Sequence, residues 1–199
     1  LITPDNGSSS GQNDLLQDLN LFSSDKIIDN EVQILQSKDI LEKIIPILNL
    51  QTSYYSLNGV RKRELYGTLP FEVKLIKPEP NADYSKQFQI RLIDSNTAEV
   101  NDKKIPLNAP YQTSVGQIVI SRRPKWSGAR NTLYNVGFHD IDDLIEDYSN
   151  RLKVEPVSKQ ATVLTISLED AVPQRGKDFL NNLIEEYNNK FYFGIENFY

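Results

Sequence analysis

The chain of 199 residues contains no cysteine and no methionine, and it has only one histidine and one tryptophan. Without cysteine there are no disulfides, thiolate nucleophiles or cysteine-ligated zinc, although the cellular compartment stays open. Because methionine is absent, we expect residue 1 to lie inside a longer gene product or to follow a processed segment. No run approaches the roughly 20 apolar residues of a membrane span, and the first residues do not form a signal peptide. If the parent protein is a membrane protein, its spans therefore lie outside this chain.

The composition is that of a globular chain with a mild excess of acid. Hydrophobic residues make up 39%, charged residues 25%, and the formal net charge is −5. Nucleic-acid binding needs clustered positive charge, so we expect no nucleic-acid partner.

The first half changes from a helical pattern to a strand pattern. Apolar residues recur at helical spacing over 25–36 and about 39–49, where Pro46 should kink or end the helix. Between residues 52 and 120 apolar and polar residues alternate in short runs, as in 71–75, which is typical of strands with one buried face. The middle third is therefore predicted to be β-rich.

The last third is predicted to contain a helix, two strands and a second helix. An acidic helix is expected over 140–151, a strand over 152–157, and a second, more buried strand over 161–168. A further helix opens near Pro173, with a core stripe of Phe179, Leu180, Leu183, Ile184 and Tyr187. Residues 190–199 form an unassigned tail, because half of them are aromatic.

These patterns predict an α+β fold, with a mixed sheet, helices packed on it, and a β-rich insertion in the middle third. One domain is expected over residues 1–189, the insertion covering about 52–135. The tail at 190–199 stays outside this assignment.

Two segments resemble a known family. The first contains Asp-Leu-Asn-Leu-Phe at 18–22 and Asn-Glu-Val-Gln-Ile-Leu-Gln-Ser at 30–37. The second contains Val-Glu-Pro-Val-Ser-Lys-Gln at 154–160, Leu-Thr-Ile-Ser-Leu-Glu-Asp at 164–170 and Leu-Asn-Asn-Leu-Ile-Glu-Glu-Tyr at 180–187. Both are similar to the chain-length-determinant (Wzz-like) domain of polysaccharide co-polymerases and bacterial tyrosine autokinases. The similarity covers roughly residues 14–50 and 134–189 and concerns packing positions, not a catalytic signature.

The resemblance implies a non-catalytic domain at the periplasmic face of the bacterial inner membrane. Such a domain lies between two membrane helices, and a cytoplasmic kinase domain often follows. The resemblance further implies a ring-like homo-oligomer that works with polysaccharide polymerase or export machinery and regulates the length or export of capsular polysaccharide or exopolysaccharide. A long helix would continue after Tyr187, and there the aromatic tail departs from the family.

No catalytic, cofactor-binding or metal-binding residue is predicted. The Gly176-Lys177 pair lacks the other residues of a phosphate-binding loop. His139 has no motif around it, which favours a structural or capping role. The acidic residues at 140–147 fit a solvated helix start, and nothing selects a carboxylate pair for glycoside hydrolysis.

One basic patch is the candidate contact site. It combines positive charge with an indole ring, which can contact an anionic sugar, a lipid headgroup or an acidic partner. Its residues are Arg122, Arg123, Lys125 and Trp126, with Arg130 nearby. A second basic run occupies 61–63. The favoured interpretation of such charge is an exposed turn beside a protected strand edge.

Three other functions stay open from the sequence. A carbohydrate-binding module of a periplasmic protein would bind glycan on its own. A hydrolase would use a carboxylate pair, and an adaptor of an efflux or secretion system would bind an outer-membrane partner.

Overall fold

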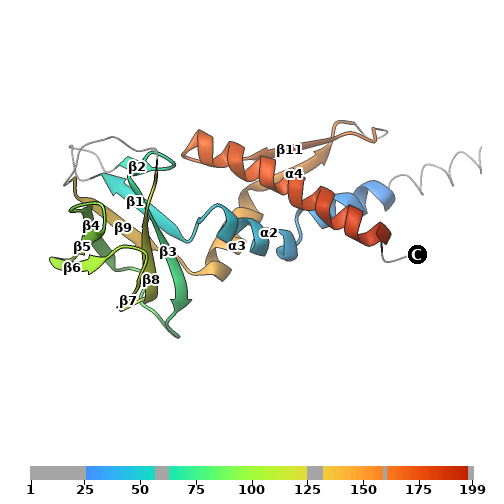
Figure 1. Cartoon of the computed structure of the whole chain (residues 1–199). Helices are drawn as coiled ribbons and strands as arrows, with labels where there is room; N and C mark the ends of the chain where they lie inside the picture. Colours follow the sequence, from blue (N-terminus) through green and yellow to red (C-terminus); the bar gives the residue numbers. More distant parts are fainter. Residues whose placement is uncertain (1–25, 57–62, 125–131, 159–160, 197–199) are drawn as a thin grey trace, which may run out of the picture.

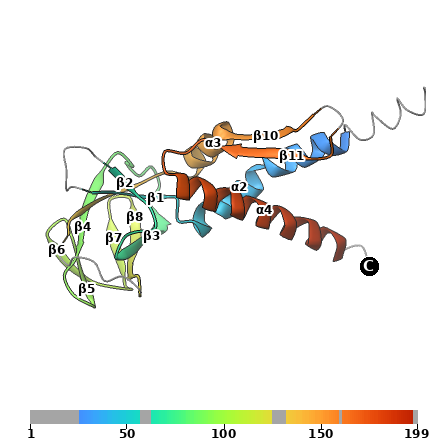
Figure 2. The same ribbon diagram turned by 90° about the horizontal axis from the view of Figure 1, so that it is seen from above.

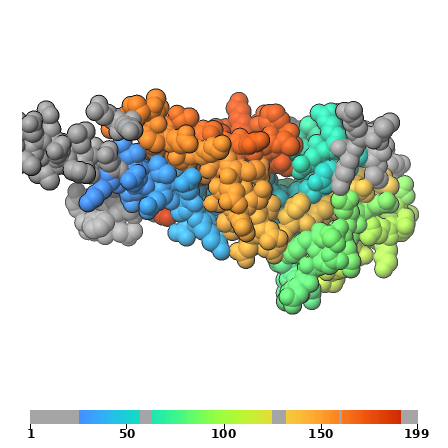
Figure 3. Space-filling model, turned by 180° about the vertical axis from the view of Figure 1, so that it is seen from behind, coloured from blue at the N-terminus to red at the C-terminus, as the bar shows by residue number. Residues whose placement is uncertain are grey.

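Two hydrophobic cores divide the chain into an α/β module and a β module (Figure 1). The computed structural model describes residues 26–56, 63–124, 132–158 and 161–196. Figure 3 shows the two modules at opposite ends of an elongated molecule. The β module is an insertion, because the first and the last described residues belong to the α/β module.

The α/β module is built from both ends of the sequence. Residues 26–35 are helical, and the remaining elements are α2 (Lys38–Ile47), α3 (Ile141–Arg151), β10 (Leu152–Pro156), β11 (Leu164–Leu168) and α4 (Pro173–Glu196). Helix α2 buries Ile40, Leu41, Ile44 and Ile45, which recur at the spacing of one helix face. These side chains share a core with Phe179 and Leu183 of α4.

The β module contains nine strands around its own core. They are β1 (Thr52–Ser56), β2 (Arg63–Leu65), β3 (Phe71–Pro78), β4 (Gln87–Leu92), β5 (Thr97–Val100), β6 (Lys103–Pro106), β7 (Pro110–Thr113), β8 (Gly116–Arg122) and β9 (Tyr134–Phe138). One sheet has the order β2-β1-β9-β4-β5-β6 and the other the order β3-β8-β7. Phe71 and Tyr134 meet edge to face across the core with ring centroids 5.6 Å apart.

The α+β class and the β-rich middle third are confirmed. In detail, the described strands form three sheets in which every described pairing is antiparallel. Short turns between consecutive strands produce many of these antiparallel pairs. Asn101 and Asp102 both have positive φ, at 45° and 65°, which is the geometry of a two-residue hairpin turn between β5 and β6.

Two burial predictions are wrong. Strand β11 is less buried than β10, and Val163 just before β11 is 61% exposed. The two-stranded sheet leaves β11 with one unpaired edge, so apolar alternation does not ensure burial. On α4, Ile184 is 47% exposed because Phe179 and Leu183 set the buried face, and the next residue turns about 100° away from it.

The tail that the sequence left unassigned continues α4. The helix runs for 24 residues and ends at Glu196. The hydroxyl of Tyr187 donates to Glu31, and Lys190 Nζ lies 3.3 Å from Asp39 Oδ2. Tyr187 and Lys190 of α4 therefore contact the first two helices, and the end of α4 lies at the end of the molecule away from the β module (Figure 2).

The chain enters and leaves the β module through two paired strands. Strand β1 leads in from α2, and β9 leads out to α3. Thr52 is opposite Phe138, and the backbone N–H of His139 donates to the carbonyl of Gln51 at 2.9 Å. We call this paired crossing, residues 51–52 and 138–139, the neck.

Asn49 sets the direction in which β1 leaves α2. Its φ is 52°, a left-handed conformation that Asn tolerates better than most residues. Its side-chain Nδ2 donates to the carbonyl of Val73 at 2.8 Å. The hydroxyls of Thr52 and Tyr54 also bond to the Val73 backbone. Three side chains from one turn and strand thus fix β1 against β3.

We expect Asn49→Ala to lower the free energy of unfolding by roughly 2–4 kcal/mol. The substitution removes the partly buried hydrogen bond to Val73. It also places alanine in a left-handed backbone conformation, which alanine tolerates less well than asparagine. Asn49→Gly should cost less, because glycine adopts this conformation freely. Urea unfolding followed by circular dichroism measures both.

Asn81→Ala is the matched control, since Asn81 has φ 59° in an exposed turn. It should cost only the backbone strain, about 1 kcal/mol. Equal losses at the two positions would show that the bond to Val73 contributes nothing.

Candidate functional site

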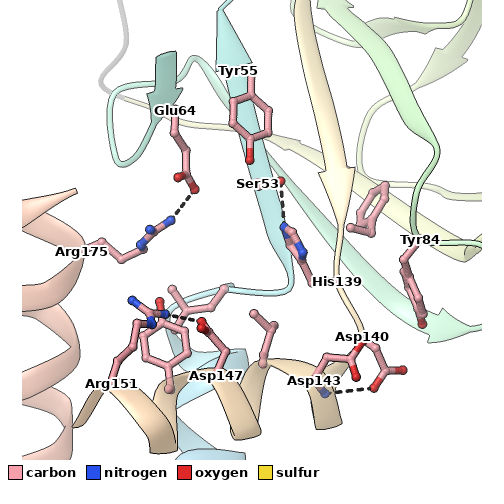
Figure 4. Close-up of a pocket in the computed structure, with 14 residues that line it drawn as sticks. Ser53, Tyr55, Glu64, Tyr84, His139, Asp140, Asp143, Asp147, Arg151 and Arg175 are labelled. Atoms are coloured by element: carbon pink, nitrogen blue, oxygen red, sulfur yellow. Dashed lines mark hydrogen bonds and ion pairs between the residues drawn. The ribbon is translucent and has the colours of Figure 1, made fainter. Parts of the chain in front are cut away.

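A cleft of about 350 Å³ lies where the two modules meet. Its walls come from both: β1, β2 and the end of β9 on one side, and α3 with the first turn of α4 on the other (Figure 4). Because the lining residues are dispersed along the sequence, only the packing of the modules creates this cavity.

Arg175 forms one wall of the cleft and joins the modules. From the first turn of α4, its guanidinium donates to Glu64 on β2. It also donates to Asp170, with Nε 2.9 Å from Oδ2 and Nη2 2.8 Å from Oδ1. The Asp170 side chain is only 2% exposed. Burial acts to lower the pKa of Arg175, but Asp170 and Glu64 outweigh it and raise the pKa.

A second contact with α4 lies just beyond the end of β2. Tyr66, just after β2, packs against the core of the α/β module. Its burial, with the hydrogen bond and charge of Asp178 on α4, raises the pKa of its hydroxyl to about 12. The end of β2 is therefore docked on α4 by one ion pair and one phenol.

Arg151 is held at the end of α3. Its Nη2 lies 2.5 Å from Asp147 Oδ2, and its Nη1 donates to the carbonyl of Glu169 at 2.8 Å. The guanidinium lies 4.4 Å from the ring centroid of Tyr148, which stacks on Phe179 at 4.5 Å. Both arginines of the cleft are thus bound by the protein itself.

His139 lies at the neck, facing the cleft. Its Nε2 is 3.0 Å from Ser53 Oγ, and the proton position depends on the tautomer. Burial lowers the pKa of His139, and the charge of Glu64 offsets part of this effect. Ser53 is 6% exposed, lies against Gly137 and lines the cleft. The pair links β1 to the end of β9 across the neck.

The acidic residues at 140–147 divide between a helix cap and the cleft. Asp140 Oδ1 accepts from the backbone N–H of Asp142 at 2.8 Å and caps α3. Asp142 bonds Lys38 at 3.0 Å and does not line the cleft, whereas Asp143 and Asp147 do. In the part of the chain that the structure describes, no three His, Asp or Glu residues are grouped as metal ligands.

The cleft has a small excess of negative charge. Its lining contains the carboxylates of Glu64, Asp140, Asp143 and Asp147 against the guanidinium groups of Arg151 and Arg175, a formal charge of −2. Buried or partly buried ion pairs of this kind orient side chains more than they stabilise a fold. The cleft is therefore polar and rigidly arranged.

The predicted basic patch is not part of this cleft. Arg122 is exposed at the end of β8, opposite Phe71, and the backbone N–H of Arg123 donates to Pro70 at 2.9 Å. Strand β8 is the central strand of its sheet, but its described pairing with β7 covers only residues 116–119, so Arg122 lies beyond these pairs. Lys125, Trp126 and Arg130 lie outside the described residues.

Sequence reasoning missed Glu64, Ser53 and Arg175. No sequence motif contains them, because only tertiary contacts bring them together. Glu64 and Arg175, for example, are more than a hundred residues apart in the sequence. One local signal existed: Asp170 and Arg175 flank the predicted helix start. Gly176 fits the same place, because a Cβ there would lie 3.2 Å from the Asp170 Cβ.

Arg175→Ala should destabilise the protein by about 3 kcal/mol, because it leaves the Asp170 carboxylate buried with a weaker set of partners. Adding Asp170→Asn should recover part of this loss by removing the buried charge. Chemical denaturation of the three variants measures it.

Lys177→Ala, on the exposed face of the same helix, is the control and should change little. An Arg175→Ala loss no larger than that of Lys177→Ala contradicts this role for the ion pair.

The lowered pKa of His139 gives a testable pH dependence. Between the unfolded pKa near 6.5 and the lower folded pKa, the unfolded chain binds more protons. Stability should therefore fall as the pH drops from about 7.5 through that interval. Since His139 is the sole histidine, His139→Gln should flatten this part of the profile. Urea unfolding at successive pH values measures it, and parallel profiles for the two proteins would contradict it.

Comparison with known proteins assigns no function to this cleft. No protein-family model matches the chain, and a search of curated proteins gives no match.

Proposed function

We propose that the chain is the non-catalytic extracytoplasmic domain of a membrane-anchored protein that regulates the chain length or export of a capsular polysaccharide or exopolysaccharide. One observation carries the proposal. The two segments that resemble the Wzz-like family, roughly 14–50 and 134–189, are separated in sequence by strands β1 to β8. Residues 26–50 and 141–187 within them nevertheless share one α/β core, whereas 134–138 form β9 of the β module. A resemblance spread over unrelated surface positions would not have this property.

The placement of the described ends supports a membrane-anchored arrangement. The first helical residues and the end of α4 lie on the same side of the molecule, away from the β module (Figure 2). Within the described ranges, no helix is long and apolar enough to cross a membrane. The proposal therefore places the anchors in flanking sequence and the β module farthest from the membrane.

The chemistry of the cleft supports a scaffold more than an enzyme. Arg151 and Arg175 are engaged by carboxylates, and Asp140 caps a helix. In the proposed role the domain forms homo-oligomers and organises polymerase or export machinery at the periplasmic face of the inner membrane.

The membrane side of the domain can be tested with a single cysteine, because the chain has none of its own. Lys104 on β6 is exposed. In a full-length protein freed of other cysteines, Lys104→Cys should react with a membrane-impermeant maleimide in cells whose outer membrane alone is permeabilised. The unsubstituted protein is the control, and labelling only after full lysis would place the domain in the cytoplasm.

The polysaccharide role needs a separate readout. Removing the gene should shift the length distribution of the surface polysaccharide on a gel or abolish the polymer, and the Lys104→Cys protein should restore it. An unchanged distribution after deletion would overturn the proposed function.

A further inference from the structure

The scaffold role leaves the cleft between the modules without a use. Its volume of about 350 Å³ falls within the range of roughly 300–1,000 Å³ that ligand pockets occupy. Aromatic and polar groups converge on it from several elements (Figure 4). A cavity with such a lining, fixed between two cores, is suited to a small polar ligand.

Aromatic rings supply apolar surface inside the cleft. Tyr55 projects from β1, and Tyr84 lies on the segment before β4, on the side of Asp140 (Figure 4). Both tyrosines are half-buried. Burial and the Asp140 carboxylate raise the pKa of Tyr84, so its hydroxyl stays protonated and able to donate. Such rings offer a flat face to C–H groups and a polar tip to hydroxyls.

The charges of the cleft disfavour an anionic ligand. Arg175 is engaged by Glu64 and Asp170, and Arg151 by Asp147 and a backbone carbonyl. An anion would have to compete with these partners and enter a lining of formal charge −2. Phosphate, sulfate and uronate groups are therefore poor candidates.

The same groups favour hydroxyl donors over a cation. A carboxylate accepts hydrogen bonds at about four lone-pair positions, so those in ion pairs still have capacity. Asp143 lines the cleft with an exposed carboxylate. The start of α3, between Asp140 and Asp143, carries partial positive charge that weakens attraction of a cation. Acceptors held in place beside aromatic rings match the hydroxyls and C–H faces of a sugar.

We propose that this cleft binds a short segment of uncharged glycan, with Asp143 accepting from sugar hydroxyls and Tyr84 contacting a pyranose ring. The inference rests on the proposed function, for which the cleft is the contact with the polymer. Both modules contribute walls, so the bound segment lies against the neck.

The sole histidine provides a site-specific probe. His139 lies in the cleft, and its imidazole resonances are unique because the chain has one histidine. We expect uncharged oligosaccharides, size-fractionated from the surface polysaccharide of the cells that make the protein, to shift these resonances saturably. A hexalysine peptide and an oligouronate are the charged comparison ligands, and neither should match the effect.

Asp143→Ala should weaken the binding about tenfold, as expected for loss of a hydrogen bond to a charged acceptor. Asp142→Ala is the matched control, because Asp142 lies in the same first turn but bonds Lys38 outside the cleft. It should bind as the unsubstituted protein does. Tyr84→Ala should also weaken oligosaccharide binding, through the loss of a contact on the opposite wall of the cleft.

Each outcome decides the proposal. Absence of a saturable shift with the oligosaccharides overturns it, and so does a shift that Asp143→Ala leaves unchanged, which would locate the binding elsewhere. A shift with hexalysine alone would make the cleft a site for basic peptide. If gene deletion alters polysaccharide length but the oligosaccharides do not bind, only this inference fails. If deletion has no effect, the proposed function fails while the binding result stands.

Discussion

The buried carboxylate of Asp170 is the interaction on which the junction of the two modules depends. A charge with 2% of its side chain exposed must be paired and hydrogen-bonded, and the chain supplies Arg175, Arg151 and the backbone N–H of Val172. Pairing with Asp170 fixes the direction of the Arg175 side chain. Arg175 then meets Glu64 on β2, so a requirement inside the α/β module sets the position of a strand in the other.

The cleft follows from this junction. Once β2 is docked on α4 and β1 is fixed by Asn49, the space between α3 and the end of β9 is left unfilled by either core. Several polar side chains of the cleft also form the ion pairs and the helix cap that hold the two modules together, and these contacts fix their orientation. In the proposed binding role, residues that stabilise the fold therefore also line the binding site, which keeps the site rigid.

Most of the fold could be predicted from local periodicity, because amphipathic helices and alternating strands show their buried faces in sequence. The spacing of Leu41, Ile44 and Ile45 predicted a helix over about 39–49, where the structure has α2 with these three residues buried. Burial of β11 and of Ile184 could not be predicted, since a pattern shows an apolar face but not whether another element covers it. The aromatic tail likewise favoured no helix by composition, although α4 continues through it to Glu196. For the site, clustering in sequence pointed to Arg122 and Arg123, whereas the cleft combines residues as distant as Glu64 and Arg175, which only the tertiary arrangement brings together.

The neck has a consequence for how such a chain can diverge. Because Thr52 and Phe138 are paired neighbours, the chain connects the insertion to the host core through two adjacent strands. The side chains of Glu64 and Tyr66 add contacts with α4 beside this connection. Either a hairpin of a few residues or a much larger insert could connect these two strands without changing the spacing of the helices in the α/β module. The cost of a longer closed loop grows only logarithmically with its length. The host core can therefore stay constant while the inserted part is exchanged, enlarged or lost, and this gives one framework many distal surfaces.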